Sequence, residues 1–577
     1  MLVNFNVFKG QNFATPNHML PIELGQTAYN MYIEDGRFVP MYCTKAQSSS
    51  TTFNGNEETI YLHRNINTNE SKWFTSTYWT PVVRHPNGAD IQQRIYFIEN
   101  GRPKYKRYSD SYVYDLLLPA VNPQEQLGVY LSSTGTIRRF LAYTLVTEYG
   151  DESALSLVEN GYGDYSYGNY LISNLALDTS LTITWNPSSI IPTGGNYNNK
   201  ITKIRFYMTP TEVTTDGYRF IGESSISTAA MTIHDAGSDT PLLEALNSPV
   251  KVTYDFFDST NPCISVSKTM FGSIVIADKS NIYVSDIYQP SSFSGTNVYS
   301  VDSEVKGVYP FGSSIAVFTS TVPSIFTGNA PDTLTVEKAE QARAVSNIKC
   351  VVNTDDYIVF PTDEGIYVLG TGVYKLATDG VITKRNWEDL TNKGSYLLSA
   401  THYKDQYILL LTTGKAYIFD FLRGFFSETN FANPDYTQIG DCVPDKNILR
   451  VSYYDSIDQE LYGVPTKGSS FSTIYVYEGS DNQRTGLFKS KRFIVNKPFS
   501  MKYLRVLADD FTDANISISI YYNGDLFQTV NITSDKIYKL QSQFTKEMEV
   551  EISSNVTLRN VIISDNIKEI QAIWVQY

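Results

Sequence analysis

The sequence predicts an all-β protein: a β-propeller with an inserted β-sandwich domain and further sandwich strands at the C-terminal end. Three observations predict this fold class. The 577-residue chain has an aromatic content of 14%, from 43 Tyr and 30 Phe but only 5 Trp. Helical periodicity is nearly absent, and hairpin units repeat at a regular spacing through the middle of the chain. The length exceeds what one hydrophobic core supports, so roughly two to four domains are expected.

The aromatic content favours sheets because Tyr and Phe fit the pleated, half-buried surface of a strand. Tyr also offers rigid contact area with a polar tip, which suits interfaces between subunits. An AT-rich genome is the alternative explanation, because it raises the content of Tyr, Asn, Ile and Lys regardless of function. The best helical candidate, around residues 337–344 in TLTVEKAEQARAVS, is short and equally compatible with a loop.

Five hairpin units repeat in the middle of the chain. Their first strands begin at positions 274, 315, 358, 408 and 449, which are separated by 41, 43, 50 and 41 residues. Each unit has a buried strand, a tight turn and a second strand with a central aromatic residue, as in IVIA followed by IYV. A period of about 40–50 residues is typical of four-stranded propeller blades. One blade cannot bury both faces of its sheet alone, so neighbouring blades stack around an axis.

The flanking segments differ from this repeat. Residues 1–124 are predicted to form N-terminal strands that contribute to the propeller, and residues 125–245 an inserted β-sandwich domain of fibronectin type III character. Residues 246–485 form the propeller core. Residues 486–577 alternate between apolar and polar positions, as in NISISIYYNG. This alternation is typical of strands with one solvated face and predicts a C-terminal β-rich domain.

The charge and the cellular context are inferred from composition. The net charge of −14 and the pI near 5.0 argue against tight binding of nucleic acid, because phosphate contacts need a basic surface. An acidic surface suits a conduit along which DNA slides without being held, although simple solubility explains it equally well. The N-terminal residues lack a signal-peptide core, and no stretch approaches eighteen apolar residues. We therefore expect a protein made and folded in a cytoplasm, without a membrane anchor.

The cysteines and histidines predict no metal site. Cys43, Cys263, Cys350 and Cys442 are widely scattered without CxxC spacing, and we expect free thiols. The five histidines are in no HExxH or HxH motif, and we expect them on the surface or in loops. They are His18, His63, His85, His234 and His402.

The sequence contains no recognisable catalytic motif. The chain has no GxGxxG before a helix, no phosphate-binding loop and no GxSxG elbow. Because propellers often carry glycosidases, the carboxylates Asp355, Asp356, Asp363 and Glu364 are the candidates for glycan hydrolysis, but they fall where turns are expected. Sialidase-type SxDxGxTW repeats and calcium loops are missing. The sequence therefore predicts no enzyme, no cofactor, and no catalytic, cofactor-binding or metal-binding residue.

A series of short motifs resembles a known family. The segments are LPIELGQTAYNMYIEDGRFVP at 20–40, RIYFIENGRPK at 94–104, YTLVTEYGDES at 143–153, GSSIAVFT at 312–319, TGNAPD at 327–332, AVS at 344–346, DEGIY at 363–367 and GLFKSKRF at 486–493. In this order they resemble the tail nozzle family, or tail tubular protein B-like family, of short-tailed bacteriophages. Each motif alone is weak, and the ordered series is the specific signal.

The resemblance implies a structural role in a virion. Members of that family form a ring of six copies below the portal and adaptor, and the genome leaves through its channel. The expected partners are other copies of the chain, tail adaptor or portal-associated ring proteins, tail fibres, and double-stranded DNA that passes without specific binding. The alternatives are a receptor-binding propeller and a glycan-processing propeller of the depolymerase or sialidase kind.

Overall fold

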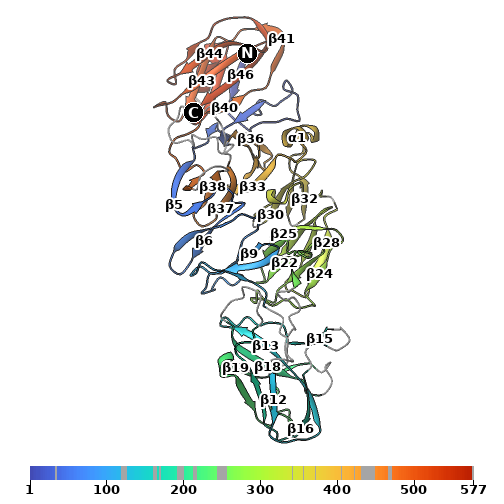
Figure 1. Cartoon of the computed structure of the whole chain (residues 1–577). Helices are drawn as coiled ribbons and strands as arrows, with labels where there is room; N and C mark the ends of the chain where they lie inside the picture. Colours follow the sequence, from blue (N-terminus) through green and yellow to red (C-terminus); the bar gives the residue numbers. More distant parts are fainter. Residues whose placement is uncertain are drawn as a thin grey trace. The chain divides into compact units, whose positions relative to one another are not determined.

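The structure is a computed structural model in which strands form nearly all of the regular elements (Figure 1). The described residues form two compact units. Unit 1 comprises Met1–Leu62, Lys72–Trp79 and Glu340–Tyr577, and unit 2 comprises His63–Ser71 and Thr80–Ala339. The described ranges are 1–32, 36–118, 127–159, 165–167, 170–191, 201–211, 217–243, 256–340, 342–354, 356–370, 372–403, 406–421, 423–430, 449–465 and 471–574.

Three of the four-stranded antiparallel sheets of unit 2 are propeller blades. In each blade the strands follow one another in chain order, as tight hairpins dictate. The first blade comprises β8 (Val83–Arg84), β9 (Ile95–Glu99), β10 (Arg102–Lys106) and β11 (Val113–Asp115), the second β21 (Ser265–Lys268), β22 (Ile274–Ala277), β23 (Asn281–Val284) and β24 (Val298–Ser300), and the third β25 (Val305–Phe311), β26 (Ser314–Thr319), β27 (Ser324–Thr327) and β28 (Thr335–Lys338).

The strand β22 shows why blades need neighbours on both faces. Its four residues are all fully buried. Ile274 and Ile276 belong to a cluster shared with the first blade, where Tyr96 and Tyr105 lie. Val275 and Ala277 point to the opposite face and belong to a cluster shared with the third blade. Successive side chains of a strand alternate between faces, so an unbroken apolar run predicts a strand buried on both sides.

The inserted domain of unit 2 is a two-sheet β-sandwich. A three-stranded sheet packs on a four-stranded one around one core that includes Leu145, Ile183 and Phe206, as expected of a β-sandwich. The sheets are β12 (Leu127–Leu131), β17 (Leu181–Trp185) and β20 (Ala230–Ile233), and β16 (Tyr170–Leu175), β13 (Ile137–Thr147), β18 (Ile201–Met208) and β19 (Arg219–Ser225), with the hairpin of β14 (Leu157–Glu159) and β15 (Tyr165–Tyr167) and a 3-10 helix at Ile226–Thr228 beside them.

Unit 1 contains three further blades with the same alternation. In β34, Tyr407 and Leu409 face one cluster, while Ile408 and Leu410 face the next. The blades comprise β29 (Val352–Asn353), β30 (Tyr357–Pro361), β31 (Ile366–Gly370) and β32 (Val373–Leu376); β33 (Leu397–Tyr403), β34 (Gln406–Leu411), β35 (Lys415–Asp420) and β36 (Phe425–Asn430); and β37 (Leu449–Asp455), β38 (Glu460–Pro465), β39 (Phe471–Val476) and β5 (Lys45–Phe53). A 3-10 helix spans Ile348–Cys350, and β6 (Thr59–Asn65) and β7 (Glu70–Ser76) pair as a hairpin.

The last blade takes its fourth strand from the N-terminal part of the chain. Ala46 and Gln47 of β5 pair with Tyr475 and Ile474 of β39. All five predicted hairpins are present, but they do not occupy the same place in each blade. The first four are the second and third strands of their blades, whereas the hairpin that begins at Leu449 is the first and second. An apolar pattern does not show whether a hairpin forms the first and second or the second and third strands of a blade. The regular spacing of the fifth hairpin therefore did not reveal its different place.

A second β-sandwich unites the two ends of the chain in unit 1 (Figure 1). Leu2 of β1 pairs with Ser564 of β47, and β2 pairs with β40 and with β36. The predicted segment 1–124 is therefore divided between two kinds of domain. β1 and β2 belong to this sandwich, whereas β5 and β8–β11 belong to propeller blades. One sheet comprises β1 (Leu2–Phe5), β47 (Leu558–Ser564), β42 (Tyr503–Ala508) and β45 (Tyr538–Lys539), and the other β2 (Thr27–Tyr29), β40 (Gly486–Lys489), β46 (Thr545–Ser554), β43 (Ile516–Tyr522) and β44 (Asp525–Ile532), with β41 (Phe493–Phe499) on β46; β3 (Met31–Tyr32) and β4 (Val39–Pro40) form a short hairpin.

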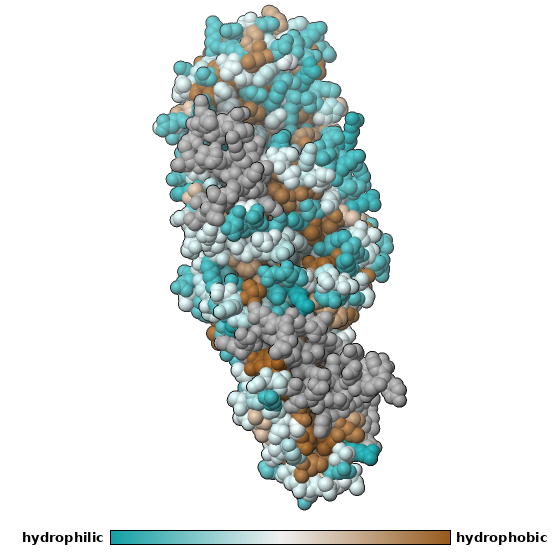
Figure 2. All heavy atoms as spheres, viewed as in Figure 1, coloured by the Kyte–Doolittle hydropathy of each residue, from teal (hydrophilic) through white to brown (hydrophobic). Residues whose placement is uncertain are grey.

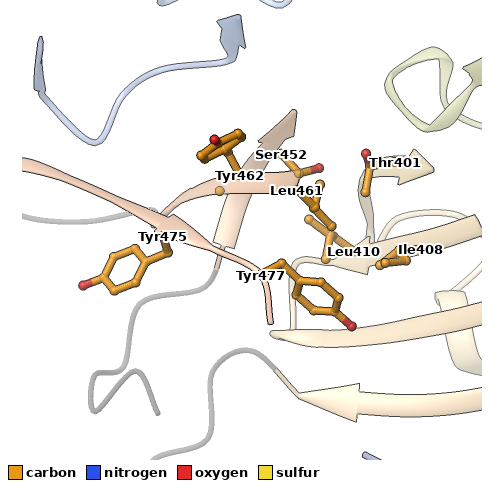
Figure 3. Close-up of a pocket in the computed structure, with 9 residues that line it drawn as sticks. Thr401, Ile408, Leu410, Ser452, Leu461, Tyr462, Tyr475 and Tyr477 are labelled. Carbon is orange, nitrogen blue, oxygen red and sulfur yellow. The ribbon is translucent and has the colours of Figure 1, made fainter. Parts of the chain in front are cut away.

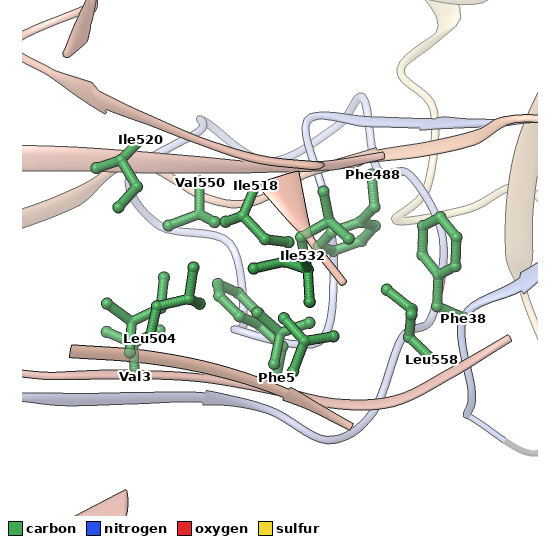
Figure 4. Packing of buried hydrophobic residues seen from close by; sticks show 14 of the residues in the cluster. Val3, Phe5, Phe38, Phe488, Leu504, Ile518, Ile520, Ile532, Val550 and Leu558 are labelled. Atoms are coloured by element: carbon green, nitrogen blue, oxygen red, sulfur yellow. The ribbon is translucent and has the colours of Figure 1, made fainter. Parts of the chain in front are cut away.

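The core of this sandwich is apolar on both inner faces. Figure 4 shows Val3 and Leu504 of one sheet facing Ile518 and Val550 of the other. These four side chains are at most 1% exposed. Each fully buried aliphatic side chain contributes about 1.5–3 kcal/mol relative to an exposed one, so this core holds both chain ends in place.

The helices of the described residues are short. α1 (Lys384–Thr391) begins after Thr383, whose hydroxyl accepts a hydrogen bond from the Asn386 N–H at 3.2 Å, and α2 (Ile567–Trp574) follows β47. The helical candidate at 337–344 is wrong, because β28 ends at Lys338 and residues 339, 340 and 342–344 form no helix. Among the described residues, no helix has the length and apolarity that crossing a membrane requires.

The Phe53→Ala variant tests the contribution of β5 to the last blade. Phe53 is fully buried among Ile474, Val476 and Trp73, so its truncation is expected to lower the free energy of unfolding by about 3–5 kcal/mol. Urea denaturation followed by tryptophan fluorescence measures the loss. The control is Thr52→Ala at the neighbouring exposed position, which is expected to change stability by less than about 0.5 kcal/mol. Equal losses in both variants would contradict the pairing of β5.

Candidate functional site

A pocket lined mainly by polar and charged side chains lies in unit 2, where the end of β6 approaches β8 and the loop that follows β8. Its volume of about 30 Å³ leaves room for a single small group. Ligand pockets for whole small molecules are much larger, at about 300–1,000 Å³. The residues that line it are His63, Arg64, Ile66, Arg84, His85, Asn87, Gly88, Asp90, Gln93, Arg94 and Ile95.

The loop between β8 and β9 is fixed by its own hydrogen bonds. The side-chain oxygen of Asn87 accepts from the Ala89 N–H at 3.0 Å, as in an Asx turn. The Gln93 side chain donates to the backbone oxygen of Asp90 at 2.6 Å, and Gln93 has a left-handed φ of 49°. A non-glycine residue in this conformation is held by its surroundings, so the loop is preorganised.

Arg94 is the centre of a buried ionic cluster. Its guanidinium group contacts Asp90 Oδ2 at 3.2 Å and Asp151 Oδ2 at 3.3 Å. The three side chains are 10%, 8% and 16% exposed. Burial raises the pKa of Asp151 although Arg94 opposes the shift, whereas Arg94 keeps the pKa of Asp90 low against its burial. Because Asp151 belongs to the inserted sandwich and Asp90 to the loop of the first blade, the cluster joins these two parts of unit 2.

His85 is a neutral acceptor in this cluster. Its Nε2 lies 3.0 Å from an Arg94 nitrogen, which can only donate. The other ring nitrogen, Nδ1, lies 3.0 Å from the backbone nitrogen of Asn87, whose N–H donates to it, and 3.3 Å from the backbone oxygen of the same residue. Burial and then the charge of Arg94 lower the pKa of His85 to about 4. His85 therefore orients Arg94 and is not available as a general base.

Arg107 forms a second link between the first blade and the insert. Its Nε contacts Asp110 Oδ2 at 2.8 Å, and its guanidinium lies 4.5 Å from the centre of the Tyr114 ring. It also donates to the Tyr149 hydroxyl and lies 3.7 Å from Glu148 of the same turn. The turn after β13 thus supplies partners for both arginines.

One of the five histidines differs from the sequence prediction. His18 and His234 are exposed, as expected, and His402 is half-buried against Tyr454. The prediction is wrong for His63, which lies in β6 and is 1% exposed. His85 lies in a loop, as expected, although it is only 8% exposed and lines the same pocket as His63. The sequence holds one signal that could have revealed the pair. Arg64 follows His63 and His85 follows Arg84, so a basic side chain stands next to an imidazole in both places.

The carboxylates that are candidates for glycan hydrolysis lie in unit 1 and are paired with cations. Asp363 contacts Lys384 Nζ at 2.9 Å, and Glu364 contacts Arg343 Nε at 3.4 Å. Asp356 is described in the bend before β30, whereas Asp355 lies outside the described residues. Glycosidases need two carboxyl groups across a substrate cleft. The described carboxylates of this group line neither the polar pocket of unit 2 nor the apolar pocket of unit 1.

The residues that the structure describes offer neither a metal cluster nor a reactive thiol. Over the described ranges, no three His, Cys, Asp or Glu side chains are close enough to hold a metal ion. Cys263 and Cys350 are free and buried, as predicted. Burial raises the pKa of both thiols, which makes them unreactive. The prediction of a free thiol is wrong for Cys43, which is disulfide-bonded; Cys442 lies outside the described residues.

The apolar pocket of unit 1 lies between two blades. Figure 3 shows Ile408 and Leu410 of one blade beside Leu461 and Tyr477 of the next. Its lining contains no carboxylate, imidazole or amine. We interpret it as a packing gap between the two blades.

Comparison with known proteins gives likeness of fold only. No family model matches the chain, and no curated protein matches it. Among solved structures it is similar to Hsv2 of Kluyvelomyces marxianus, with 10% identity, coverage of 63% of this chain and 95% of that chain, and a TM-score of 0.27. It is also similar to the Pan2 WD40 domain of Neurospora crassa (10% identity, 63% and 90% coverage, TM-score 0.26) and to BamB of Moraxella catarrhalis (11%, 51% and 86%, 0.23). At these values the matches carry no inference about function.

The Arg94→Met variant tests the ionic cluster. It leaves the Asp90 and Asp151 carboxylates buried without their cation, so we expect unit 2 to lose about 3–5 kcal/mol of stability. Thermal unfolding of the full chain measures the effect. Arg219→Met, on the exposed edge strand β19, is the matched control and is expected to leave stability unchanged within about 0.5 kcal/mol. A similar stability for both variants would contradict the role of Arg94.

The pKa of His85 predicts a loss of stability in mild acid. Between its usual pKa of 6.5 and the folded value of about 4, the unfolded chain binds a proton that the folded chain does not. The free energy of unfolding therefore falls as the pH is lowered through this window. Asp90, with its lowered pKa, adds a loss at lower pH, and Asp151, with its raised pKa, opposes it. We expect the melting temperature of His85→Asn to change less between pH 6.5 and pH 4 than that of the exposed control His234→Asn. If the melting temperatures of both variants change equally with pH, the lowered pKa of His85 is refuted.

Proposed function

We propose that the chain is a structural subunit of a podovirus-like phage tail, which forms a ring-shaped nozzle and conducts the genome during ejection. The observation that carries the proposal is the ordered series of motifs from Leu20 to Phe493 that resembles the tail nozzle family. The motifs lie in the sandwich that contains β2 and β40, in the first and third blades, in the inserted domain, and in and around the blade of β29–β32. They therefore cover both units, as expected for a resemblance of the whole chain.

The mechanical properties of the fold suit such a subunit. A ring under the pressure of a packed genome needs rigid domains, and blades buried on both faces are rigid because their side chains interdigitate. The inserted domain is tied to the first blade through Arg94 and Arg107, each of which contacts the turn after β13. Both chain ends are held in one sandwich core.

The surface is consistent with assembly and with DNA passage. Figure 2 shows small hydrophobic areas scattered among hydrophilic ones on the visible face. Exposed apolar side chains such as Tyr130, Met270 and Phe544 occur in both units and offer contact area for neighbouring copies. The net charge of −14 lets duplex DNA pass without the phosphate contacts that would hold it.

The enzyme and receptor-binding alternatives predict different behaviour. A glycan-processing propeller needs paired carboxylates in an open cleft, whereas Asp363 and Glu364 are engaged with Lys384 and Arg343. A receptor-binding propeller acts as a monomer or trimer and retains a host glycan. A ring subunit does neither.

Cryo-electron microscopy tests the proposal. We expect six-fold particles with a central channel wide enough for duplex DNA, either from the purified chain at high concentration or as a tail ring in virions labelled by an antibody against the chain. A chain that stays monomeric or trimeric and is absent from tails would overturn the proposal. Depolymerisation of a host polysaccharide by the purified chain would favour the enzyme instead.

A further inference from the structure

Three exposed apolar side chains belong to two loops that meet at one end of the second blade. Met270 is 78% exposed in the turn between β21 and β22, and Ile287 and Tyr288 are 42% and 56% exposed in the loop between β23 and β24. The Tyr288 N–H donates to the backbone oxygen of Gly272 at 2.8 Å, which joins the loop to the turn. We call Met270, Ile287 and Tyr288 the Tyr288 patch.

The loop that carries Tyr288 is fixed by contacts beneath it. The Asp286 carboxylate accepts hydrogen bonds from the Ser292 hydroxyl at 2.6 Å and from the Asn297 amide at 3.2 Å. Phe293 of the same loop is fully buried in the cluster shared by the first and second blades. Because the loop is already ordered, a partner that binds the patch does not incur the entropy cost of ordering it.

Tyr288 is in a strained backbone conformation. Its φ of 58° lies in the left-handed region, which a bulky residue rarely adopts and glycine adopts without steric cost. Its ring lies over Gly272, where a Cβ atom would be 2.5 Å from a ring carbon. Glycine would suit the backbone at position 288 better than tyrosine does, so the fold gives no reason for this side chain. Strain of this kind points to a function of the exposed ring.

The charge beside the patch is positive. Lys268 is exposed at the end of β21, two residues before Met270, and has no carboxylate partner in the part of the chain that the structure describes. Asp286 is the only acidic residue in either loop, and its carboxylate is engaged by Ser292 and Asn297. The whole chain has a net charge of −14, so two copies repel each other over most of their surfaces. A positive site is where a second copy can approach.

The third blade has an exposed acidic edge. β28 is the last strand of its sheet, and all four of its residues are exposed. Asp332 and Glu337 are exposed at this edge, and neither has a cation partner among the described residues. Val336, which is 59% exposed, adds apolar area. The β28 edge therefore complements the Tyr288 patch and Lys268 in charge and in apolar character.

We propose that the Tyr288 patch of one copy of this chain binds the β28 edge of a second copy. The apolar side chains of the patch pack on Val336, and Lys268 pairs with Glu337. The two surfaces are different parts of the chain, so the contact is heterologous and can be repeated from copy to copy until a ring closes. The inference rests on the proposed ring function and names the surfaces that hold its subunits together.

The first test is sedimentation velocity of the full chain over a range of concentrations. We expect Tyr288→Gly to weaken self-association about tenfold or more, because it removes the central aromatic side chain. Its melting temperature is expected not to fall, because glycine fits the left-handed backbone. Leu526→Ala removes a side chain that is 58% exposed in unit 1 and is the matched control, which is expected to associate like the wild type.

A charge exchange tests which surface is the partner. Lys268→Glu and Glu337→Lys are each expected to weaken self-association about fivefold or more, because each places like charges opposite each other. The two substitutions combined in one chain restore an opposite pair and are expected to restore the association.

Three results would overturn the proposal. They are a wild type that stays monomeric at every concentration, a Tyr288→Gly variant that associates as strongly as the wild type, and a double exchange that associates no better than either single exchange. The nozzle proposal fails separately. A chain that associates through the patch but is absent from virion tails contradicts the nozzle alone, and a six-fold ring that Tyr288→Gly leaves intact contradicts this contact alone.

Discussion

The architecture depends on the need of each blade to bury both faces of its sheet. In β22 and β34, neighbouring residues of one strand belong to two different hydrophobic clusters. Such a strand loses half of its buried area if the blade on either side is removed, at about 25 cal/mol per Å² of apolar surface. This requirement explains the apolar runs in the sequence. β5 differs from these strands, because it is mostly exposed and completes the last blade through its backbone pairing with β39.

Burial of both faces of each blade also determines which hairpins could be predicted from the sequence. The hairpins at 274, 315, 358 and 408 were predictable because strands buried on both sides have unbroken apolar runs. The place of the hairpin at Leu449 within its blade was not, because the partner strand β5 is polar and lies about four hundred residues earlier. The assignment of β1 and β2 to the C-terminal sandwich has the same cause, since pairing between distant segments leaves no local pattern.

The candidate site was the least predictable feature. A sequence motif requires residues at fixed spacing, whereas the cluster of His85, Arg94 and Asp151 forms only when the inserted domain folds back onto the first blade. Basic residues next to histidines at two separate strands were visible in the sequence, but nothing in it showed that they meet. The wrong prediction for Cys43 is of the same kind, because a disulfide depends on three-dimensional proximity.

The proposed function makes this chain a building block of a symmetric conduit. The most direct measurement is native mass spectrometry of the full-length chain across a range of concentrations. The account predicts an oligomer of six copies that forms without a ligand. A species that remains a monomer or a trimer at every concentration and releases sugars from a host polysaccharide would contradict it.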